Sequence, residues 1–151
     1  MKESLLLDGS YEDPEINLRR VMFWPDNILE LLTRFGVRRE FDLLSIDMDS
    51  YDWWMLEKIL EGGYRPRVIV TEYNMMMAIN ESKTILPPED NKSWKMWDGT
   101  TRYYGSSILA VKYLMKRFNY SLIWCNLVNC IGKNMMLVYA VFISYHFSRC
   151  A

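Results

Sequence analysis

Three aspartates follow an apolar run in the segment FDLLSIDMDSYDWWMLEKILEGG, residues 41–63. Asp47 and Asp49 end the run, and Asp52 precedes apolar residues at helical spacing. A carboxylate at a strand end can orient a hydroxyl group or take its proton. We therefore interpret Asp47 and Asp49 as candidate catalytic residues, and Asp52 as the cap of the following helix.

A second apolar run, RVIVTEYN at residues 67–74, carries Glu72 and Asn74 at its end. With Asp47 and Asp49, these side chains offer oxygens of the kind that magnesium accepts. Aspartate and asparagine are also common in turns and helix caps, which is the structural alternative for the whole group. We predict that Glu72 and Asn74 face the substrate, and we assign no metal ligand from the sequence.

Strand and helix patterns alternate along the chain. Strands are expected at 4–9, 16–23, 41–47 and 67–74, and helices after Pro25, from Trp53 to the Gly62-Gly63 pair, and from Ile108. Two closing strands, 121–128 and 135–143, are expected to form a hairpin through 131–134. The pattern predicts an α/β domain with a mainly parallel sheet and a C-terminal antiparallel hairpin.

The polar segment 75–104 is too long for an ordinary connection, so we interpret it as a functional insert or lid. Its end, WKMWDGTTRYYGSS, combines aromatic rings with Asp98 and Arg102, which could clamp a small acceptor or an anionic group. The alternative is a loop that its aromatic residues hold against the domain.

The composition restricts the class of protein. The 151 residues, 50% of them hydrophobic, suffice for a single domain with one core, and the net charge of −1 provides no field that would attract nucleic acid or an anionic membrane. The longest apolar run, 135–147, is shorter than the ~20 residues of a membrane-spanning helix. Three cysteines without metal-ligand spacing, and no leader pattern, predict reduced thiols in a cytoplasmic protein.

Four segments together resemble a class I S-adenosylmethionine-dependent methyltransferase domain, in particular the FkbM-like and related methyltransferase-like proteins. They are LLLDGSYEDPEINL, FDLLSIDMDSYDWWMLEKIL, YRPRVIVTEYN and WDGTTRYYGSSILAVKYL, and the likeness covers residues 4 to 140. In this chain Ser50 stands where relatives tend to have a glycine. The resemblance implies a Rossmann-like sheet, S-adenosylmethionine as cofactor, and methyl transfer to an oxygen or nitrogen of a small-molecule acceptor.

The resemblance also implies roles for three residues in the first part of the chain. Asp8 would accept hydrogen bonds from the ribose hydroxyls of the cofactor, and Asp26 and Asn27 would lie beside the adenine. The alternatives are an Asp-Gly turn for Asp8 and a helix cap for Asp26 and Asn27.

In the fold of this family, a first strand and a glycine-rich loop precede the LLLDG strand, and this chain begins after them. None of its glycines form a G-x-G-x-x-G pattern. We therefore expect one partial domain, 1–151, incomplete at the N-terminus, with a gap between strands 4–9 and 41–47 that is paired within the chain, covered, or shared in a homo-oligomer. Cofactor binding and activity would be impaired. The alternatives are a non-catalytic remnant that acts as an interaction module, and a truncated chain.

Overall fold

The computed structural model describes residues 4–90, 92–133 and 140–144. Over these residues the chain forms an α/β fold with helices α1 (Ile28–Arg34), α2 (Asp52–Glu61) and α3 (Ile108–Arg117). Its mixed sheet contains β1 (Leu6–Asp8), β2 (Leu18–Arg20), β3 (Glu40–Asp47), β4 (Arg65–Glu72), β5 (Ser121–Cys125), β6 (Asn129–Lys133) and β7 (Ala140–Ser144).

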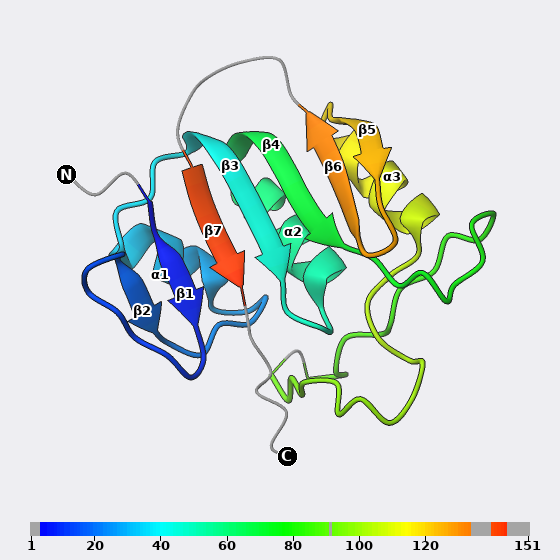
Figure 1. Ribbon diagram of the computed structural model, residues 1–151, viewed down its shortest axis with the longest axis horizontal. Coiled ribbons are helices and arrows are strands. Elements are labelled where there is room, and N and C mark those ends of the chain that lie inside the picture. The colour runs from blue at the N-terminus through cyan, green and yellow to red at the C-terminus, as the bar shows by residue number, and fades with distance from the viewer. Residues whose placement is uncertain (1–3, 91, 134–139, 145–151) are drawn as a thin grey trace.

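The strand order of the sheet is β2-β1-β7-β3-β4-β6-β5 (Figure 1). The first five strands in this order run parallel, and β6 and β5 run antiparallel to their neighbours. The prediction that strands 41–47 and 67–74 lie adjacent and parallel is confirmed, with Leu44 opposite Ile69. Helix α2 connects these two strands, as parallel pairing requires.

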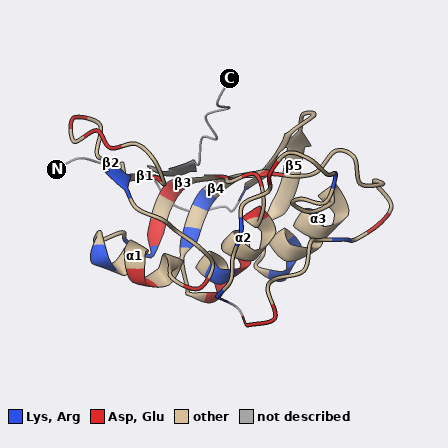
Figure 2. Cartoon of the chain, turned by 90° about the horizontal axis from the view of Figure 1, so that it is seen from below, with Lys and Arg blue, Asp and Glu red and all other residues tan. Residues whose placement is uncertain are grey.

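The described helices all lie on one face of the sheet (Figure 2). The core fills the space between them and the strands, and its fully buried side chains include Leu7, Leu44, Ile46, Ile69, Met55, Leu56, Ile59 and Leu60. On the opposite face of the sheet Leu43, Val68 and Val70 are only half-buried. No helix among the described residues is long and apolar enough to cross a lipid bilayer.

The end of α2 and the start of α3 follow local capping signals in the sequence. Helix α2 is followed by Gly62 and Gly63, and Gly63 has a φ of 83°, which a residue with a side chain rarely adopts. Helix α3 begins after Ser107, whose hydroxyl accepts a hydrogen bond from the backbone N–H of Ala110 at 3.2 Å. Local capping chemistry therefore determines where α2 ends and where α3 begins.

The predicted C-terminal hairpin is wrong in its second strand. Strand β5 pairs with β6 through a turn at 126–128, so the predicted turn at 131–134 falls mostly within β6. Residues 140–143 of the expected hairpin strand lie in β7 instead, and 134–139 lie outside the described residues. An apolar run indicates a buried strand but does not identify its partner, which explains the error.

Strand β7 lies between β1 and β3 and is parallel to both. This is the position that the sequence analysis left empty. The expected gap is therefore paired within the chain, and a homo-oligomer through an exposed edge at that position loses its structural basis. Ladder hydrogen bonds to both neighbours make β7 an interior strand.

The prediction of reduced thiols is also wrong for one pair of cysteines. Cys125 and Cys130 form a disulfide between opposite positions of β5 and β6, with their Cα atoms 4.2 Å apart. The spacing of these cysteines in the sequence is poor for a metal site, which favours reduced thiols. The β5–β6 hairpin that brings them face to face differs from the hairpin predicted from the sequence. Cys150 lies outside the described residues.

Replacing Phe142 by proline should destabilise the protein by about 3 kcal/mol or more, because proline removes a backbone donor from a strand paired on both sides. Urea unfolding with a matched Phe142→Ala variant isolates the backbone effect. Arg20→Pro is the control on the edge strand β2. The Val21 N–H donates to the Asp8 carbonyl of β1. Because successive backbone N–H groups of a strand point to opposite sides, the Arg20 N–H points away from β1. The loss in free energy of unfolding for Phe142→Pro is corrected by subtracting the loss for Phe142→Ala. If the corrected loss equals that of Arg20→Pro, the interior position of β7 is contradicted.

Chemical labelling tests the disulfide. When thiols are blocked at lysis and the chain is then unfolded without reductant, mass spectrometry should find one modified cysteine of the three. After reduction the remaining two should react. Modification of all three cysteines before reduction would contradict the disulfide.

Candidate functional site

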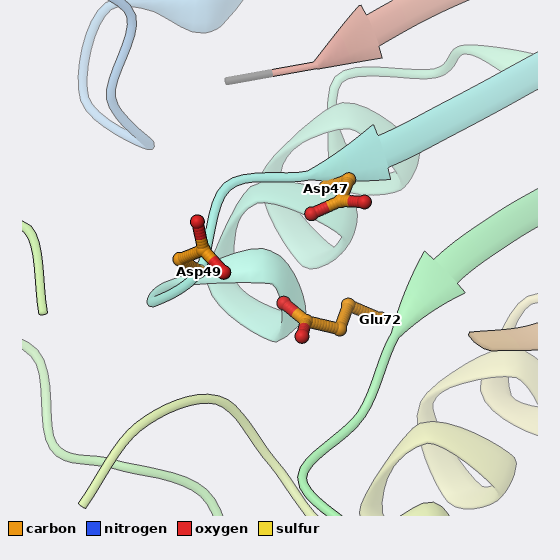
Figure 3. Close-up of side chains that lie close together, drawn as sticks. All are labelled: Asp47, Asp49 and Glu72. Carbon is orange, nitrogen blue, oxygen red and sulfur yellow. The ribbon is translucent and has the colours of Figure 1, made fainter. Parts of the chain in front are cut away.

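Three carboxylates gather where β3 and β4 end. Asp47 is the last residue of β3 and Glu72 the last of β4, and the register places Ile46 opposite Thr71, so the next residues lie side by side on one face. Asp49 follows in the turn after β3. One carboxylate oxygen from each residue lies within 4.8 Å of the others (Figure 3). We call Asp47, Asp49 and Glu72 the acidic centre.

The turn between β3 and α2 presents Asp49 to this centre. Asp49 adopts a φ of 54°, in the left-handed region that aspartate and asparagine tolerate better than most residues. Asp52, only 1% exposed, accepts hydrogen bonds from the backbone N–H groups of Met48 at 3.1 Å and Ser50 at 3.2 Å. The position of Asp49 is therefore set by bonds from inside the turn.

The predicted capping role of Asp52 needs correction. Asp52 is the first residue of α2, and the N-cap position belongs to Tyr51, which makes no side-chain cap bond. The Asp52 carboxylate bonds the preceding turn rather than the first amides of the helix. Ser50, at the position where relatives tend to have a glycine, is buried, and its carbonyl accepts a bond from the Gly105 N–H at 2.9 Å.

Burial and like charge shift two of the carboxyl groups strongly. Burial, followed by the charges of Asp52, Asp47 and Asp49, raises the pKa of Glu72 to about 9, against a hydrogen bond from the Asp49 backbone. Burial also raises the pKa of Asp52 to about 7, partly opposed by the Met48 N–H. Glu72 is 9% exposed, and its Oε2 has no hydrogen-bond partner. At neutral pH Glu72 therefore holds a proton in the absence of a ligand.

Asn129 extends the row of polar side chains onto a third strand. It is the first residue of β6 and lies directly opposite Glu72. Opposite residues of paired strands share a face, so Asp47, Glu72 and Asn129 follow one another across the sheet. The Oδ1 of Asn129 is buried without a hydrogen-bond partner. Asn129 is not among the site residues predicted from the sequence, because only the β4–β6 register places it here.

Asn74 fastens the long segment 75–104 to the sheet rather than facing the acidic centre with a free amide. Its Nδ2 donates to the carbonyls of Arg102 at 3.0 Å and Tyr104 at 2.9 Å, and its Oδ1 accepts from the Met76 N–H at 2.9 Å. Every hydrogen-bonding group of this amide is engaged within the chain. Asn74 therefore positions the segment, and its Oδ1 keeps one acceptor position beyond the bond from Met76.

Asp98 and Arg102, the predicted clamp, are both exposed. Asp98 accepts bonds from the N–H and hydroxyl of Thr100 in its own turn, and these bonds lower its pKa. Arg102 contributes its backbone carbonyl to Asn74. Neither residue is brought to the acidic centre by a contact in the described part of the chain.

Aromatic contacts hold the end of this segment, as the structural alternative proposed. Trp97 stacks on Tyr104 at a centroid distance of 4.3 Å, and Trp94 meets Tyr51 edge-on at 4.8 Å. Burial, followed by the charges of Glu72 and Asp49, raises the pKa of Tyr104. Tyr104 thus brings a phenol close to the acidic centre, a contact that the sequence pattern did not indicate.

Asp8 ends β1 and is 5% exposed. Its Oδ1 accepts hydrogen bonds from the backbone N–H groups of Ser10 at 2.6 Å and Tyr11 at 2.8 Å. These bonds build the Asp-Gly turn of the alternative interpretation. An ionised carboxylate has further acceptor positions, so the turn and a ribose contact are compatible.

Asn27 and Asp26 lie in the turn before α1. Asn27 is the N-cap residue without a side-chain cap bond, and its amide instead accepts from the Trp24 N–H at 2.8 Å and donates to the Met22 carbonyl at 3.1 Å. Asp26 is exposed. The Asn27 side chain thus stabilises the turn, and an adenine contact by either residue remains a prediction.

Comparison of the chain with protein-family models, with curated proteins and with solved structures finds no match.

Stability of the metal-free protein should depend on pH through Glu72. The pKa of Glu72 is about 9 in the folded protein, and its usual value is 4.5. Because the folded state holds the proton more tightly than the unfolded state, the free energy of unfolding is highest below pH 4.5 and falls as the pH rises toward 9. In a chelator-containing buffer at pH 8, Glu72→Gln should therefore raise the free energy of unfolding by as much as about 5 kcal/mol, since roughly 3.5 pH units separate pH 8 from the usual pKa and each is worth about 1.4 kcal/mol.

The measurement is urea unfolding of the wild type and Glu72→Gln between pH 5 and pH 9. Glu30→Gln, at an exposed position of α1, is the control for loss of a carboxylate. The prediction fails if the stability difference between the wild type and Glu72→Gln is the same at both ends of this range.

Proposed function

We propose that this chain is an S-adenosylmethionine-dependent methyltransferase-like domain acting on an oxygen or nitrogen of a small molecule. The observation that carries the proposal is the common edge formed by the carboxyl ends of β1, β3 and β4, where Asp8, Asp47 and Glu72 are the last residues of their strands. Open α/β sheets bind ligands outside the carboxyl ends of their parallel strands. The four resembling segments supply these residues.

The position of β7 supports the same proposal. The resemblance implies a central parallel strand between the strands that end in Asp8 and Asp47, and β7 lies there in the parallel direction. A Rossmann-like methyltransferase sheet can therefore be proposed for this chain with its central strand supplied from residues 140–144.

The chemistry proposed for the acidic centre is positioning and proton transfer. S-adenosylmethionine supplies an electrophilic methyl group when it is bound. Asp47 and Asp49 would orient the acceptor and take its proton, while protonated Glu72 can donate a hydrogen bond. The ribose end of the cofactor fits the remaining acceptor positions of Asp8. The methionine end has no glycine-rich cradle in the described part of the chain.

An interaction module without catalysis is the second candidate. It is favoured by exposed apolar side chains on the β5–β6 hairpin, where Ile123, Trp124 and Leu127 are 57%, 55% and 70% exposed. Exposed apolar patches of this kind commonly mark protein contacts. This candidate predicts that the acidic edge has no affinity for the cofactor.

The compartment of the proposed activity depends on the cysteines. The sequence pattern predicts a cytoplasmic protein, and cellular reductants keep thiols reduced in the cytosol. The Cys125–Cys130 disulfide favours an oxidising compartment instead. The labelling experiment described above, applied to cells that express the chain, decides between the two.

The chain should bind S-adenosylmethionine only weakly, with a Kd above about 100 μM, because a helix N-terminus with glycine-loop donors is what usually holds this class of ligand. Saturation-transfer NMR should show contact with the ribose and adenine protons of the cofactor and of its demethylated product. Asp8→Asn, which keeps an oxygen for the turn, should weaken binding by roughly 1 to 3 kcal/mol.

Glu30→Gln, which changes an exposed carboxylate of α1 outside the strand ends, is the control and should bind as the wild type does. If no saturation-transfer signal appears at about 5 mM S-adenosylmethionine, the cofactor site is excluded and the interaction module is favoured. Equal binding by wild type and Asp8→Asn would remove the ribose assignment. Micromolar affinity would mean that another segment supplies the cradle.

A further inference from the structure

We propose that the acidic centre binds a hard divalent cation, with Asp47, Asp49 and Glu72 as its carboxylate ligands. The proposal does not depend on methyl transfer, because it rests on the geometry of these residues alone. The class of ion is Ca²⁺, Mn²⁺ or Mg²⁺, which carboxylate oxygens bind best.

Glu72 is the residue that points to a ligand. Its side chain is 9% exposed, and Figure 3 shows it directed from the end of β4 toward Asp49 and Asp47. The Oε2 of Glu72 has no hydrogen-bond partner, although a buried polar atom without one costs on the order of 1 to 3 kcal/mol. A bound cation that is coordinated by Glu72 Oε2 would compensate the free-energy cost of burying this oxygen without a hydrogen bond.

The separation of the three carboxylates fits one ion. Two ligands on opposite sides of an ion can lie at most twice the metal–oxygen distance apart, which is about 4.2 Å for Mg²⁺ and about 5.2 Å for Ca²⁺. The oxygens offered by Asp47, Asp49 and Glu72 all lie within 4.8 Å of one another. Ca²⁺ therefore fits these separations directly, whereas the smaller Mg²⁺ needs every pair of oxygens to lie within about 4.2 Å.

Asn129 offers a fourth oxygen from the neighbouring strand. It stands opposite Glu72 in the β4–β6 register, where Cβ atoms lie about 5 Å apart. Its Oδ1 is buried and has no hydrogen-bond partner, which is the same condition as that of Glu72 Oε2. Two unsatisfied oxygens on facing residues are consistent with one shared ligand.

The turn that carries Asp49 is built to present a carboxylate. Its left-handed φ of 54° is a conformation that costs free energy for most residues, and such positions gather at binding sites. The buried Asp52 carboxylate holds the turn from within through Met48 and Ser50. Asp52 thus acts as a positioning residue, since its oxygens are occupied by the backbone of the turn.

The experiment uses the full chain after chelator treatment and removal of the chelator. Mn²⁺ binding is followed by electron paramagnetic resonance, and Ca²⁺ and Mg²⁺ are titrated by calorimetry. We expect one site with a Kd below about 1 mM, the weak end of protein calcium sites, with Ca²⁺ and Mn²⁺ bound more tightly than Mg²⁺.

Two variants test the ligands while preserving the fold. Glu72→Gln keeps the shape of the side chain, and Asp49→Asn keeps a residue that tolerates the left-handed backbone. Each should weaken Mn²⁺ binding by about tenfold or more, since even residues outside the first ligand set can cost that much. Glu30→Gln on the exposed face of α1 should bind as the wild type does.

Failure to fold cannot be mistaken for loss of the site, because Glu72→Gln is expected to stabilise the metal-free protein. Absence of Mn²⁺ binding up to about 1 mM by folded wild-type protein would overturn the proposal. Wild-type affinity in both Glu72→Gln and Asp49→Asn would do the same, because the ion would then lie elsewhere. Cation binding without cofactor binding would support the cation site and count against methyl transfer. Cofactor binding without cation binding would support the proposed function and overturn the cation site.

Discussion

The parallel pairing of β3 with β4 is the constraint on which the rest of the structure depends. Both strands are apolar enough for burial, and both end in a carboxylate, so in-register pairing forces Asp47 and Glu72 side by side. Pairing of the strands satisfies their backbone hydrogen-bonding groups. Burial of the strand ends also removes the Glu72 carboxyl group from water. The acidic centre is thus a direct consequence of how the core is formed.

The electrostatic cost of this arrangement is visible in the pKa values of Glu72 and Asp52, which burial and the charges of neighbouring carboxylates raise to about 9 and about 7. A fold selected for stability alone would place an apolar side chain at the end of β4, because buried charge without a partner is unfavourable. The left-handed Asp49 adds a second local cost beside the first. Costs that converge at one edge of a sheet are typical of sites that bind or react.

Segments distant in the sequence complete this edge. Strand β7 brings residues 140–144 between β1 and β3, and the end of the segment 75–104 returns to the β3–α2 turn through the bond from Gly105 to Ser50. Asn74 secures the same return by bonding the carbonyls of Arg102 and Tyr104. As a result Tyr104 lies close enough to the acidic centre for Glu72 and Asp49 to affect its titration.

Short-range patterns in the sequence determined the ends of the main elements. The apolar runs that form β3 and β4, the glycine pair after α2 and the serine before α3 act within a few residues, and the structure keeps each of them. The gathering of Asp47, Asp49 and Glu72 followed as well, because adjacent parallel strands end at the same edge. Tertiary structure alone decided the central place of β7, the Cys125–Cys130 disulfide, the position of Asn129 opposite Glu72 and the hydrogen bonds of Asn74. These features depend on which strand pairs with which across long stretches of chain, and an apolar run records only that it will be buried, not against what.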